Sequence, residues 1–140
     1  MTTKEKLLAL LEDSKGTFFS GEEIARTLQV SRAAVWKAVN ALREDGYTID
    51  AATNKGYRLS PDSDILSPQG IRRFLKPEYR DLDLTVLPTA PSTNALVREK
   101  ANQGRPEGCV IVACEQTAGR GRYGRQFFSP VDSGVYLSLL

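Results

Sequence analysis

The chain has 140 residues, enough for one ordinary domain or two small ones. Hydrophobic residues make up 41% and charged residues 26%, which argues against a disordered chain, and a formal net charge of +2 is too small to identify a partner. There is no apolar run of about 18 residues and no leader with a cleavage site, so neither a membrane span nor secretion is expected. With no histidine and only Cys109 and Cys114, the sequence predicts no metal site and two free thiols in a reducing cytoplasm.

The N-terminal third of the chain is patterned as three amphipathic helices. Residues 4–13 place leucines at helical spacing, with charges on the other face. Ser20 and Glu23 have the capping-box spacing at the start of a second helix, and Ser31 is the expected N-cap of a third that ends at Gly46. The second and third helices are joined by a turn of two residues, which predicts a helix-turn-helix.

The charges of the third helix favour nucleic-acid binding. Between Ile24 and Arg43 the sequence has four basic residues and no acidic one. Apart from Trp36, the side chains off the apolar stripe are cationic, amide or short, and such groups suit phosphates and base edges in the major groove. A solvated helix face is the alternative interpretation. The predicted DNA-binding residues of this region are Ser31, Arg32, Ala33, Trp36, Lys37 and Asn40.

Residues 47–59 are patterned as a β-hairpin. Apolar residues alternate on both sides of the turn sequence "TNKG", and a hairpin after a helix-turn-helix is a wing. Lys55 and Arg58 are expected to reach backbone phosphates, because no acidic residue lies between Asp50 and Asp62. DNA binding is the favoured interpretation, although some winged helices serve only as protein-interaction modules.

Composition changes after the hairpin. Residues 60–68 contain two prolines, two aspartates and three serines, so we predict a DNA-binding domain over residues 1–60, a linker over 61–68 and a second domain over 69–140.

The second domain is predicted to contain both helices and strands. A short amphipathic helix is expected over residues 69–76, a strand over 81–88, and a helix with Ser92 at its N-cap within 90–104. Two further strands are predicted, over residues 108–116 and 133–140. The fold class is therefore an N-terminal winged helix-turn-helix followed by the beginning of an α/β or α+β domain, with α+β favoured. A strand that runs to Leu140 leads us to expect an N-terminal fragment of a longer protein.

The segment "EQTAGRGRYGR", residues 115–125, is the most unusual of the chain. Its glycines match G-x-G-x-x-G after a strand, but "RQFFSPVDSG" follows where a dinucleotide site requires a helix, and no Gly-Lys-Ser/Thr is present for a P-loop. Glycine permits close backbone approach and arginine supplies planar cationic groups, which favours a mobile loop that closes on a small anionic ligand. An RG-type nucleic-acid segment is the alternative, but it usually occurs as repeats and this copy is single.

Several of these segments resemble one known family. "EQTAGRGRYGRQFFSP" resembles the biotin-binding loop of biotin protein ligases, and "PSTNALVREKA" resembles their Ser-Thr-Asn motif. "SRAAVWKAVNALREDGY" and "NKGYRL" resemble the winged-helix N-terminus of the bifunctional members, so that the resemblance covers essentially the whole chain.

The resemblance implies both an enzymatic and a regulatory activity. Such ligases make biotinyl-5′-adenylate from biotin and ATP, with Mg²⁺ expected alongside ATP, and pass biotin to a lysine of a biotin carboxyl carrier protein. In the bifunctional members the adenylate-bound homodimer represses biotin synthesis by binding the biotin operator DNA in the cytoplasm, with no membrane involved.

The resemblance also implies roles for individual residues. Arg125 and Phe127 are expected to enclose the adenylate, and Tyr123 stands where the family loop commonly has a further arginine. No catalytic residue is expected within this chain, because the catalytic lysine and a small C-terminal β-domain would lie beyond Leu140, so we expect the chain alone to be inactive. The residues implied to bind biotin are Ser92, Thr93, Asn94, Gln116, Arg120, Gly121 and Arg122.

A function of another class stays open at this point: a biotin-sensing transcription regulator without ligase activity. In a third interpretation the wing makes protein contacts only.

Overall fold

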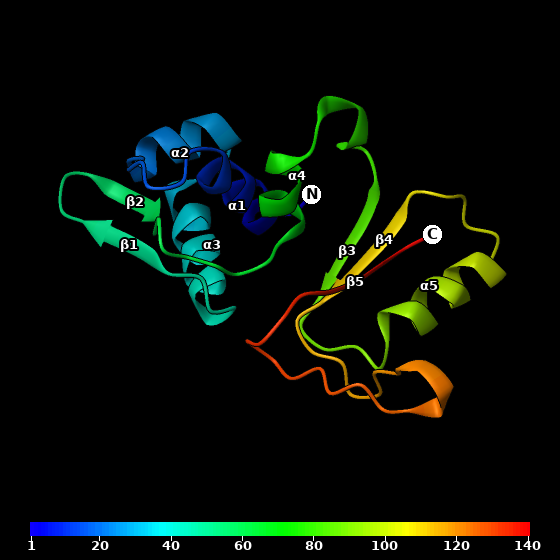
Figure 1. The fold of residues 1–140 in the computed structure, drawn as a ribbon. Coiled ribbons are helices and arrows are strands. Elements are labelled where there is room, and N and C mark those ends of the chain that lie inside the picture. The colour runs from blue at the N-terminus through cyan, green and yellow to red at the C-terminus, as the bar shows by residue number, and fades with distance from the viewer. The chain divides into compact units, whose positions relative to one another are not determined.

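The structure, a computed structural model, describes residues 1–140 and divides into two compact units, Met1–Phe74 and Leu75–Leu140. The first unit contains the segments drawn in blue to mid-green in Figure 1, and the second those drawn from mid-green to red. No helix has the length and the apolar character that crossing a membrane requires.

Four helices and one hairpin build the first unit. Helices α2 and α3 form the predicted helix-turn-helix, and the hairpin that follows α3 is the predicted wing (Figure 1). The elements are α1 (Thr3–Asp13), α2 (Gly21–Leu28), α3 (Arg32–Glu44), β1 (Ile49–Ala52), β2 (Gly56–Leu59) and α4 (Pro68–Phe74).

Side-chain caps fix where the three long helices of this unit begin. At α2 the Ser20 hydroxyl accepts from the Glu23 N–H at 3.1 Å, and the Glu23 carboxylate accepts from the Ser20 N–H at 2.8 Å, which confirms the predicted capping box. Ser31 caps α3 by accepting from the Ala34 N–H at 3.1 Å, also as predicted. A second capping box, formed by Thr2 and Glu5, starts α1 and was not predicted.

The core of the first unit joins its helices to the wing. Leucines of α1 and the apolar stripe of α3 meet residues from both strands of the hairpin, and Leu59 is fully buried. Burial of this apolar surface is the main stabilising contribution to the unit. The largest fully buried side chains are Leu7, Leu11, Ile24, Val35, Val39, Leu42 and Leu59.

The wing is held in place by the turn that precedes α2. Strands β1 and β2 pair antiparallel from Ile49 opposite Leu59 to Ala52 opposite Gly56. Phe19 and Tyr57 exchange two backbone hydrogen bonds, of 2.9 and 2.8 Å. These bonds form a single antiparallel bridge along the edge of β2 that does not face β1. Gly56 adopts a φ of +94° at this contact, and a Cβ there would lie 2.0 Å from the Phe19 carbonyl oxygen, so only glycine fits.

Helix α4 belongs to the first unit, whereas we predicted a linker over 61–68 and a second domain from residue 69. Ser67 donates from its hydroxyl to the Glu12 carboxylate at 3.5 Å and accepts from the Gly70 N–H at 2.9 Å. Arg73 donates to the Glu12 carbonyl oxygen at 2.6 Å, so α4 is tied to the end of α1. Because these bonds hold α4 against α1, the boundary between the compact units falls after Phe74.

The second unit contains a mixed sheet and one long helix. Strand order is β3-β4-β5, with β3 and β4 parallel and β4 and β5 antiparallel, as expected for an α+β domain. Helix α5 packs Val97 against the buried side chains of Cys109 and Ile111, and burial raises the pKa of the Cys109 thiol. Both cysteines are free. The elements are β3 (Asp83–Leu87), α5 (Thr93–Asn102), β4 (Cys109–Ala113), β5 (Tyr136–Leu139) and the single 3₁₀ turns Pro77–Tyr79 and Arg122–Gly124.

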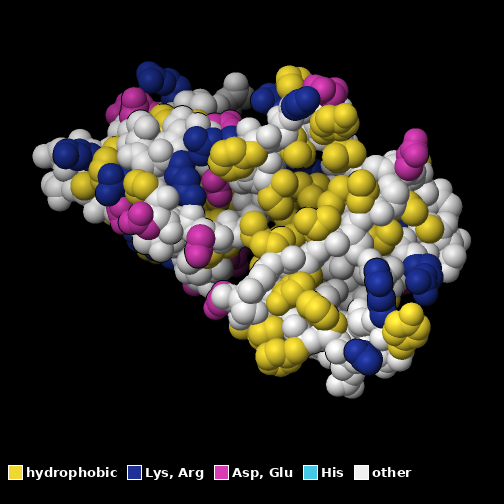
Figure 2. Space-filling view, in the orientation of Figure 1, with side chains coloured by type: hydrophobic (Ala, Val, Ile, Leu, Met, Phe, Trp, Pro, Cys, Tyr) yellow, Lys and Arg dark blue, Asp and Glu magenta, His cyan; other side chains and the backbone are white.

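The other face of this sheet is apolar and partly open. Hydrophobic side chains gather over the sheet in the space-filling view (Figure 2). On β5, Leu137 and Leu139 point to this face and are 60% and 64% exposed, whereas Ser138 between them is buried.

Candidate functional site

The exposed face of α3 carries the side chains that we predicted to contact DNA. Arg32, Ala33 and Lys37 are exposed, Trp36 is 59% exposed and Asn40 is half-buried. An indole with more than half of its surface in solvent contributes little to the core, so its place on this face is available for a partner. Ser31 is exposed as well, but its hydroxyl is engaged as the helix cap.

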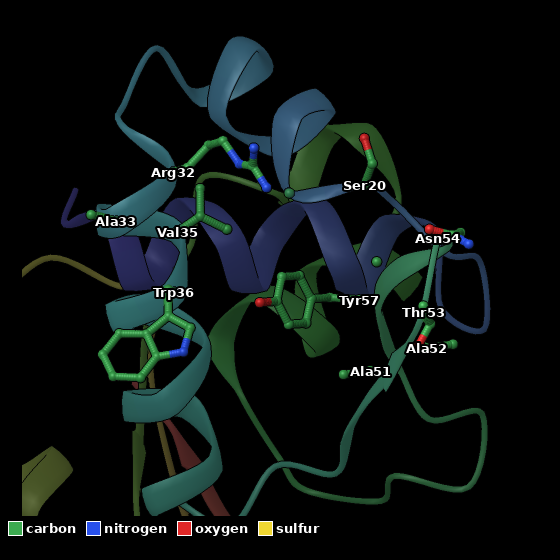
Figure 3. Close-up of a pocket in the computed structure, with 12 residues that line it drawn as sticks. Ser20, Arg32, Ala33, Val35, Trp36, Ala51, Ala52, Thr53, Asn54 and Tyr57 are labelled. Atoms are coloured by element: carbon green, nitrogen blue, oxygen red, sulfur yellow. The ribbon is translucent and has the colours of Figure 1, made fainter.

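A groove of about 740 Å³ separates the start of α3 from the wing. Arg32, Ala33 and Trp36 line one side, and wing residues, Thr53 and Asn54 among them, line the other (Figure 3). The structure therefore brings three of the predicted DNA-binding residues together. The other five do not line this groove: Ser31, Lys37, Asn40, Lys55 and Arg58.

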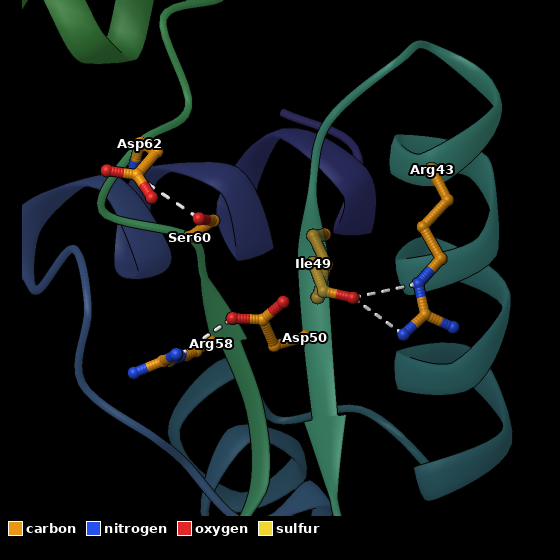
Figure 4. Close-up of polar contacts among 6 residues, drawn as sticks. All are labelled: Arg43, Ile49, Asp50, Arg58, Ser60 and Asp62. Carbon is orange, nitrogen blue, oxygen red and sulfur yellow. Dashed lines mark hydrogen bonds and ion pairs between the residues drawn. The ribbon is translucent and has the colours of Figure 1, made fainter.

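We expected both wing cations, Lys55 and Arg58, to reach DNA phosphates, but both already make contacts within the protein. Arg58 forms an ion pair with Asp50, with its Nε 2.8 Å from the carboxylate (Figure 4). Its guanidinium also lies 4.7 Å from the centre of the Phe18 ring. The Lys55 ammonium lies 5.9 Å from the same ring. Part of the Arg58 charge is therefore already satisfied, because the antiparallel register places Asp50 directly opposite Arg58.

One of the four basic residues between Ile24 and Arg43 is engaged in hydrogen bonds within the protein. Arg43 donates to the Ile49 carbonyl oxygen from Nε at 3.1 Å and from Nη2 at 2.7 Å (Figure 4). This pair of bonds ties the end of α3 to the start of β1, which makes Arg43 a structural residue of the unit.

A second concavity, a cleft of about 640 Å³, lies in the second unit at the N-terminus of α5. Five of the residues that the family resemblance marked for biotin line it together: Ser92, Thr93, Asn94, Gln116 and Arg120. They come from two places in the chain, since the start of α5 supplies the Ser-Thr-Asn residues and the segment after β4 supplies Gln116 and Arg120. Gly121, Arg122, Arg125 and Phe127 do not line the cleft.

A hydrogen-bonded network runs under this cleft. The Gln116 side-chain oxygen accepts from the Thr93 N–H at 2.8 Å and from the Thr93 hydroxyl at 3.2 Å. The Gln116 amide group donates to Ser129 at 3.1 Å, and the Thr93 hydroxyl lies 2.8 Å from that of Ser138. Thr93, Ser129 and Ser138 are buried, so these groups hold one another in position.

Among the residues of this cleft that the sequence analysis did not predict, Ser138 and Arg98 lie closest to the Ser-Thr-Asn motif. Ser138 donates to the Asn94 side-chain oxygen at 2.5 Å, and Arg98 stands one helical turn after Asn94 on α5. A signal existed for each: Ser138 is a polar residue within an apolar strand, and Arg98 is at the i+4 position from a motif residue.

The arginine–glycine segment is an irregular hairpin. Gln116 donates from its backbone N–H to Ser129 at 2.9 Å, Phe127 to Gly119 at 2.9 Å, and Gly121 to Arg125 at 2.7 Å. A Cβ at Gly119 would lie 2.6 Å from the Phe127 carbonyl oxygen, so glycine is required for the two arms to close. A single 3₁₀ turn follows Gly121 instead of an α-helix, consistent with our rejection of a dinucleotide-binding fold.

The tip of this hairpin is cationic and exposed. Arg120, Arg122 and Arg125 are exposed and form no ion pair within the protein. Tyr123 is 96% exposed at a φ of +57°, and Phe127 is 57% exposed. Three unpaired guanidinium groups on one hairpin, of which Arg120 also lines the cleft, suit an anionic ligand. No group of three or more His, Cys, Asp or Glu side chains is placed to hold a metal ion.

Comparison with known proteins gives two family matches. Residues 3–58 match the HTH domain family, and residues 86–140 match the biotin/lipoate A/B protein ligase family. The chain is 40% identical over 139 residues to the bifunctional ligase/repressor BirA of Bacillus subtilis (strain 168). It is 36% identical over 138 residues to the bifunctional ligase/repressor BirA of Escherichia coli (strain K12). Each alignment covers 99% of this chain, but only 43% and 41% of the two relatives, so the chain spans about two fifths of their length.

Proposed function

Because the chain joins an HTH domain to a segment of the biotin/lipoate A/B protein ligase family, we propose that the whole protein is a biotin protein ligase that also represses transcription. In this proposal it makes biotinyl-5′-AMP from biotin and ATP, with Mg²⁺ bound to ATP, and transfers biotin to a lysine of a carboxylase carrier protein. It represses biotin-synthesis genes by binding operator DNA. The observation that carries the proposal is that one chain combines an exposed cationic helix and wing with a cleft where a Ser-Thr-Asn motif and an arginine loop meet.

The cleft has the chemistry that this ligand requires. Short polar side chains at the start of α5, Ser92 and Asn94 among them, suit the neutral ureido group of biotin, which both donates and accepts hydrogen bonds. We propose that Arg120, which lines the cleft, and the exposed Arg122 and Arg125 stabilise the charge that develops on the attacked α-phosphate. Phe127 has an exposed ring with which to enclose the adenylate.

Labelling of a carrier domain by the whole protein tests the ligase half. We expect labelling that depends on both ATP and biotin, and a fall of about 100-fold or more in Arg120→Ala or Arg122→Ala, because each substitution removes a cation from the α-phosphate. Arg105→Ala is the matched control, since this exposed arginine pairs with Asp83 and is not part of the hairpin.

Labelling and DNA binding test the two halves of the proposal separately. Absence of labelling by the well-folded whole protein, together with biotin-responsive DNA binding, would leave the biotin-sensing regulator in place of the ligase. Absence of salt-dependent binding to any duplex would remove the repressor half and favour a wing that contacts only proteins.

The remaining parts of the proposal concern assembly and place of action. We propose that the adenylate-bound whole protein forms the homodimer that represses, that its acceptor is a biotin carboxyl carrier protein, and that it acts in the cytoplasm. Half-sites on the operator would then be related by a two-fold axis, as the protomers are.

A further inference from the structure

A small pocket lies in the first unit, where the end of α1 meets α4 and the segment that precedes it (Figure 1). Its volume is about 200 Å³, and every residue that lines it belongs to the first unit. We call it the α1–α4 pocket. Its lining is mainly apolar, and one of the apolar side chains, Phe74, is 83% exposed. The apolar lining residues are Ile65, Leu66, Ile71 and Phe74.

One carboxylate that lines this pocket is almost entirely removed from water. Glu12 is 5% exposed, and its only side-chain hydrogen bond comes from the Ser67 hydroxyl at 3.5 Å, the outer limit for such a bond. A carboxylate can accept about four hydrogen bonds. Burial of a charged group with so few partners costs free energy, so the position of this carboxylate calls for an explanation.

The unused oxygen of this carboxylate can be reached through the pocket. No fully enclosed side-chain oxygen of the chain lacks a hydrogen bond, so the second oxygen of Glu12, which has no partner, is not sealed off. Gly70 also lines the pocket, and a Cβ built there would lie 3.0 Å from the Glu12 Oε1. The absence of a side chain at Gly70 therefore leaves the approach to the carboxylate open.

The cations of this region do not neutralise Glu12. Lys15 lines the pocket, but it donates to the Ser63 carbonyl oxygen. Arg73 donates to the main-chain oxygen of Glu12 and not to its carboxylate. Glu12 forms no ion pair. The pocket thus combines apolar surface with a carboxylate that has no counter-charge, and an exposed carboxylate, that of Asp64, also lines it.

We propose that the α1–α4 pocket binds a small organic cation, with an ammonium or amidinium group on the Glu12 carboxylate and an apolar body against Ile71 and Phe74. A cavity of about 150 Å³ with apolar walls accepts a benzene ring, so a pocket of about 200 Å³ has room for one ring and a cationic substituent. A hydrogen bond from such a cation to a carboxylate is charge-assisted and therefore strong. A neutral ligand leaves Glu12 without a counter-charge, and an anion is repelled by Glu12 and Asp64.

A ligand in this pocket joins two elements that are held together mainly by polar contacts. Glu12 belongs to α1, whereas Ile71 and Phe74 belong to α4, which buries none of its side chains. Because the ligand contacts both helices, it binds only when α4 is docked and stabilises the docked arrangement as its concentration rises. The pocket therefore lets the first unit respond to a cationic small molecule close to its boundary with the second unit. This assignment is independent of the proposed ligase and repressor activities.

The experiment uses benzylamine, which is protonated at neutral pH, and benzyl alcohol, its neutral analogue of nearly the same shape. Binding to the 140-residue chain is measured by NMR titration, with the main-chain amides of Gly70 and Ile71 as reporters. We expect benzylamine to bind about tenfold more tightly than benzyl alcohol, because only the amine forms a charge-assisted bond. Benzylamine should also raise the thermal unfolding midpoint of the chain.

Substitutions separate the charge from the apolar contact. Glu12→Gln keeps the size of the side chain and removes its charge, so it should lower benzylamine affinity about tenfold and leave benzyl alcohol affinity unchanged. Asp13→Asn is the matched control, because it removes the same charge from the next residue of α1, which is exposed and does not line the pocket. Phe74→Ala removes an exposed ring and should weaken both probes by a similar factor.

Several results would show that the assignment is wrong. It fails if benzylamine and benzyl alcohol bind wild type equally, if neither binds, or if the amine shifts the resonances of the second unit instead of those of Gly70 and Ile71. It also fails if Asp13→Asn lowers benzylamine affinity as much as Glu12→Gln does. If Glu12→Gln does not fold, the comparison of the two probes on wild type and on Phe74→Ala still decides the question.

Discussion

Asp50 controls how much positive charge the wing can present. Its carboxylate pairs with Arg58 across the two strands, and the two side chains are 37% and 34% exposed. A partly exposed pair of this kind contributes little stability, so its main effect concerns the charge that is available to a partner. Arg58 also stacks on Phe18, which keeps the guanidinium near the wing surface whether or not Asp50 is present.

We therefore expect Asp50→Asn to tighten binding to non-specific duplex DNA. Release of Arg58 adds up to one phosphate contact, so the slope of log K against log salt should steepen by up to about 1. Asp45→Asn is the control, because it removes the same charge from the same unit by breaking the Lys4–Asp45 pair. Equal effects of the two substitutions would show that net charge, and not the release of Arg58, is responsible.

The Asp50–Arg58 ion pair is a single-residue contact that could not be predicted from the sequence. The sequence has no acidic residue between Asp50 and Asp62, which suggested that Arg58 is unpaired. Asp50 itself, however, is the cross-strand neighbour of Arg58. Cross-strand neighbours depend on the register of the hairpin, and that register follows from the turn and from the burial of Ile49 and Leu59.

The helices begin where local chemistry places them. In both capping boxes a backbone N–H donates to a glutamate, and this bond lowers the pKa of the Glu5 and Glu23 carboxyls below the ordinary value of 4.5. A carboxyl with a lowered pKa in the folded state stabilises the fold fully above its unfolded-state pKa. The stabilisation is lost as the pH falls through the folded-state pKa.

We expect the free energy of unfolding of the first unit to fall as the pH drops below about 4.5, partly through these two carboxyls. The double substitution Glu5→Gln and Glu23→Gln should flatten this dependence, because glutamine keeps the capping geometry and does not titrate. Urea unfolding at a series of pH values measures it. Glu22→Gln, which removes a charge from the same turn of α2 but no capping bond, should retain the wild-type dependence.

The elements that depend on short-range signals were predicted well. Ser20, Ser31 and Ser92 cap the helices that we expected them to cap, and all five strands were anticipated. The packing of α4 was not foreseen, since none of its side chains is buried. Its attachment uses Ser67, Arg73 and both the carboxylate and the main-chain carbonyl of Glu12, and no hydrophobic pattern reports contacts of this kind.

At the scale of the whole molecule, the arrangement of the candidate cleft was the least predictable feature. Its network joins Asn94 on α5 to Ser138 on β5, which are 44 positions apart in the sequence. The family resemblance supplied the motif residues, but the strand pairing of β4 with β5 is what places Ser138 beneath them. The exposed positions of Gly121, Arg122, Arg125 and Phe127 leave their roles as predictions.

The boundary after Phe74 leads to a prediction about fragments. A fragment of residues 1–75 should unfold at a higher temperature than one of residues 1–60, because α4 and its bonds to α1 are lost in the shorter one. A difference of roughly 1 kcal/mol corresponds to about 4–8 °C for a unit of this size. Circular dichroism on heating measures the midpoints. Arg73→Ala in the longer fragment should lower its midpoint part of the way, and equal midpoints for the two fragments would contradict a structural role for α4.

Gly56 has a consequence for how such a protein can diversify. No side chain fits between β2 and the Phe19 carbonyl. A substitution of Gly56 at the base of the wing would therefore break the contact that holds the wing against the rest of the domain. The tip, from Thr53 to Lys55, is exposed and makes no such close backbone contact, and its one conformational requirement is the φ of +62° at Asn54. Insertions and substitutions can therefore accumulate at the tip while the base stays fixed, which would let descendants of one ancestor acquire different target sequences without rebuilding the domain that presents them.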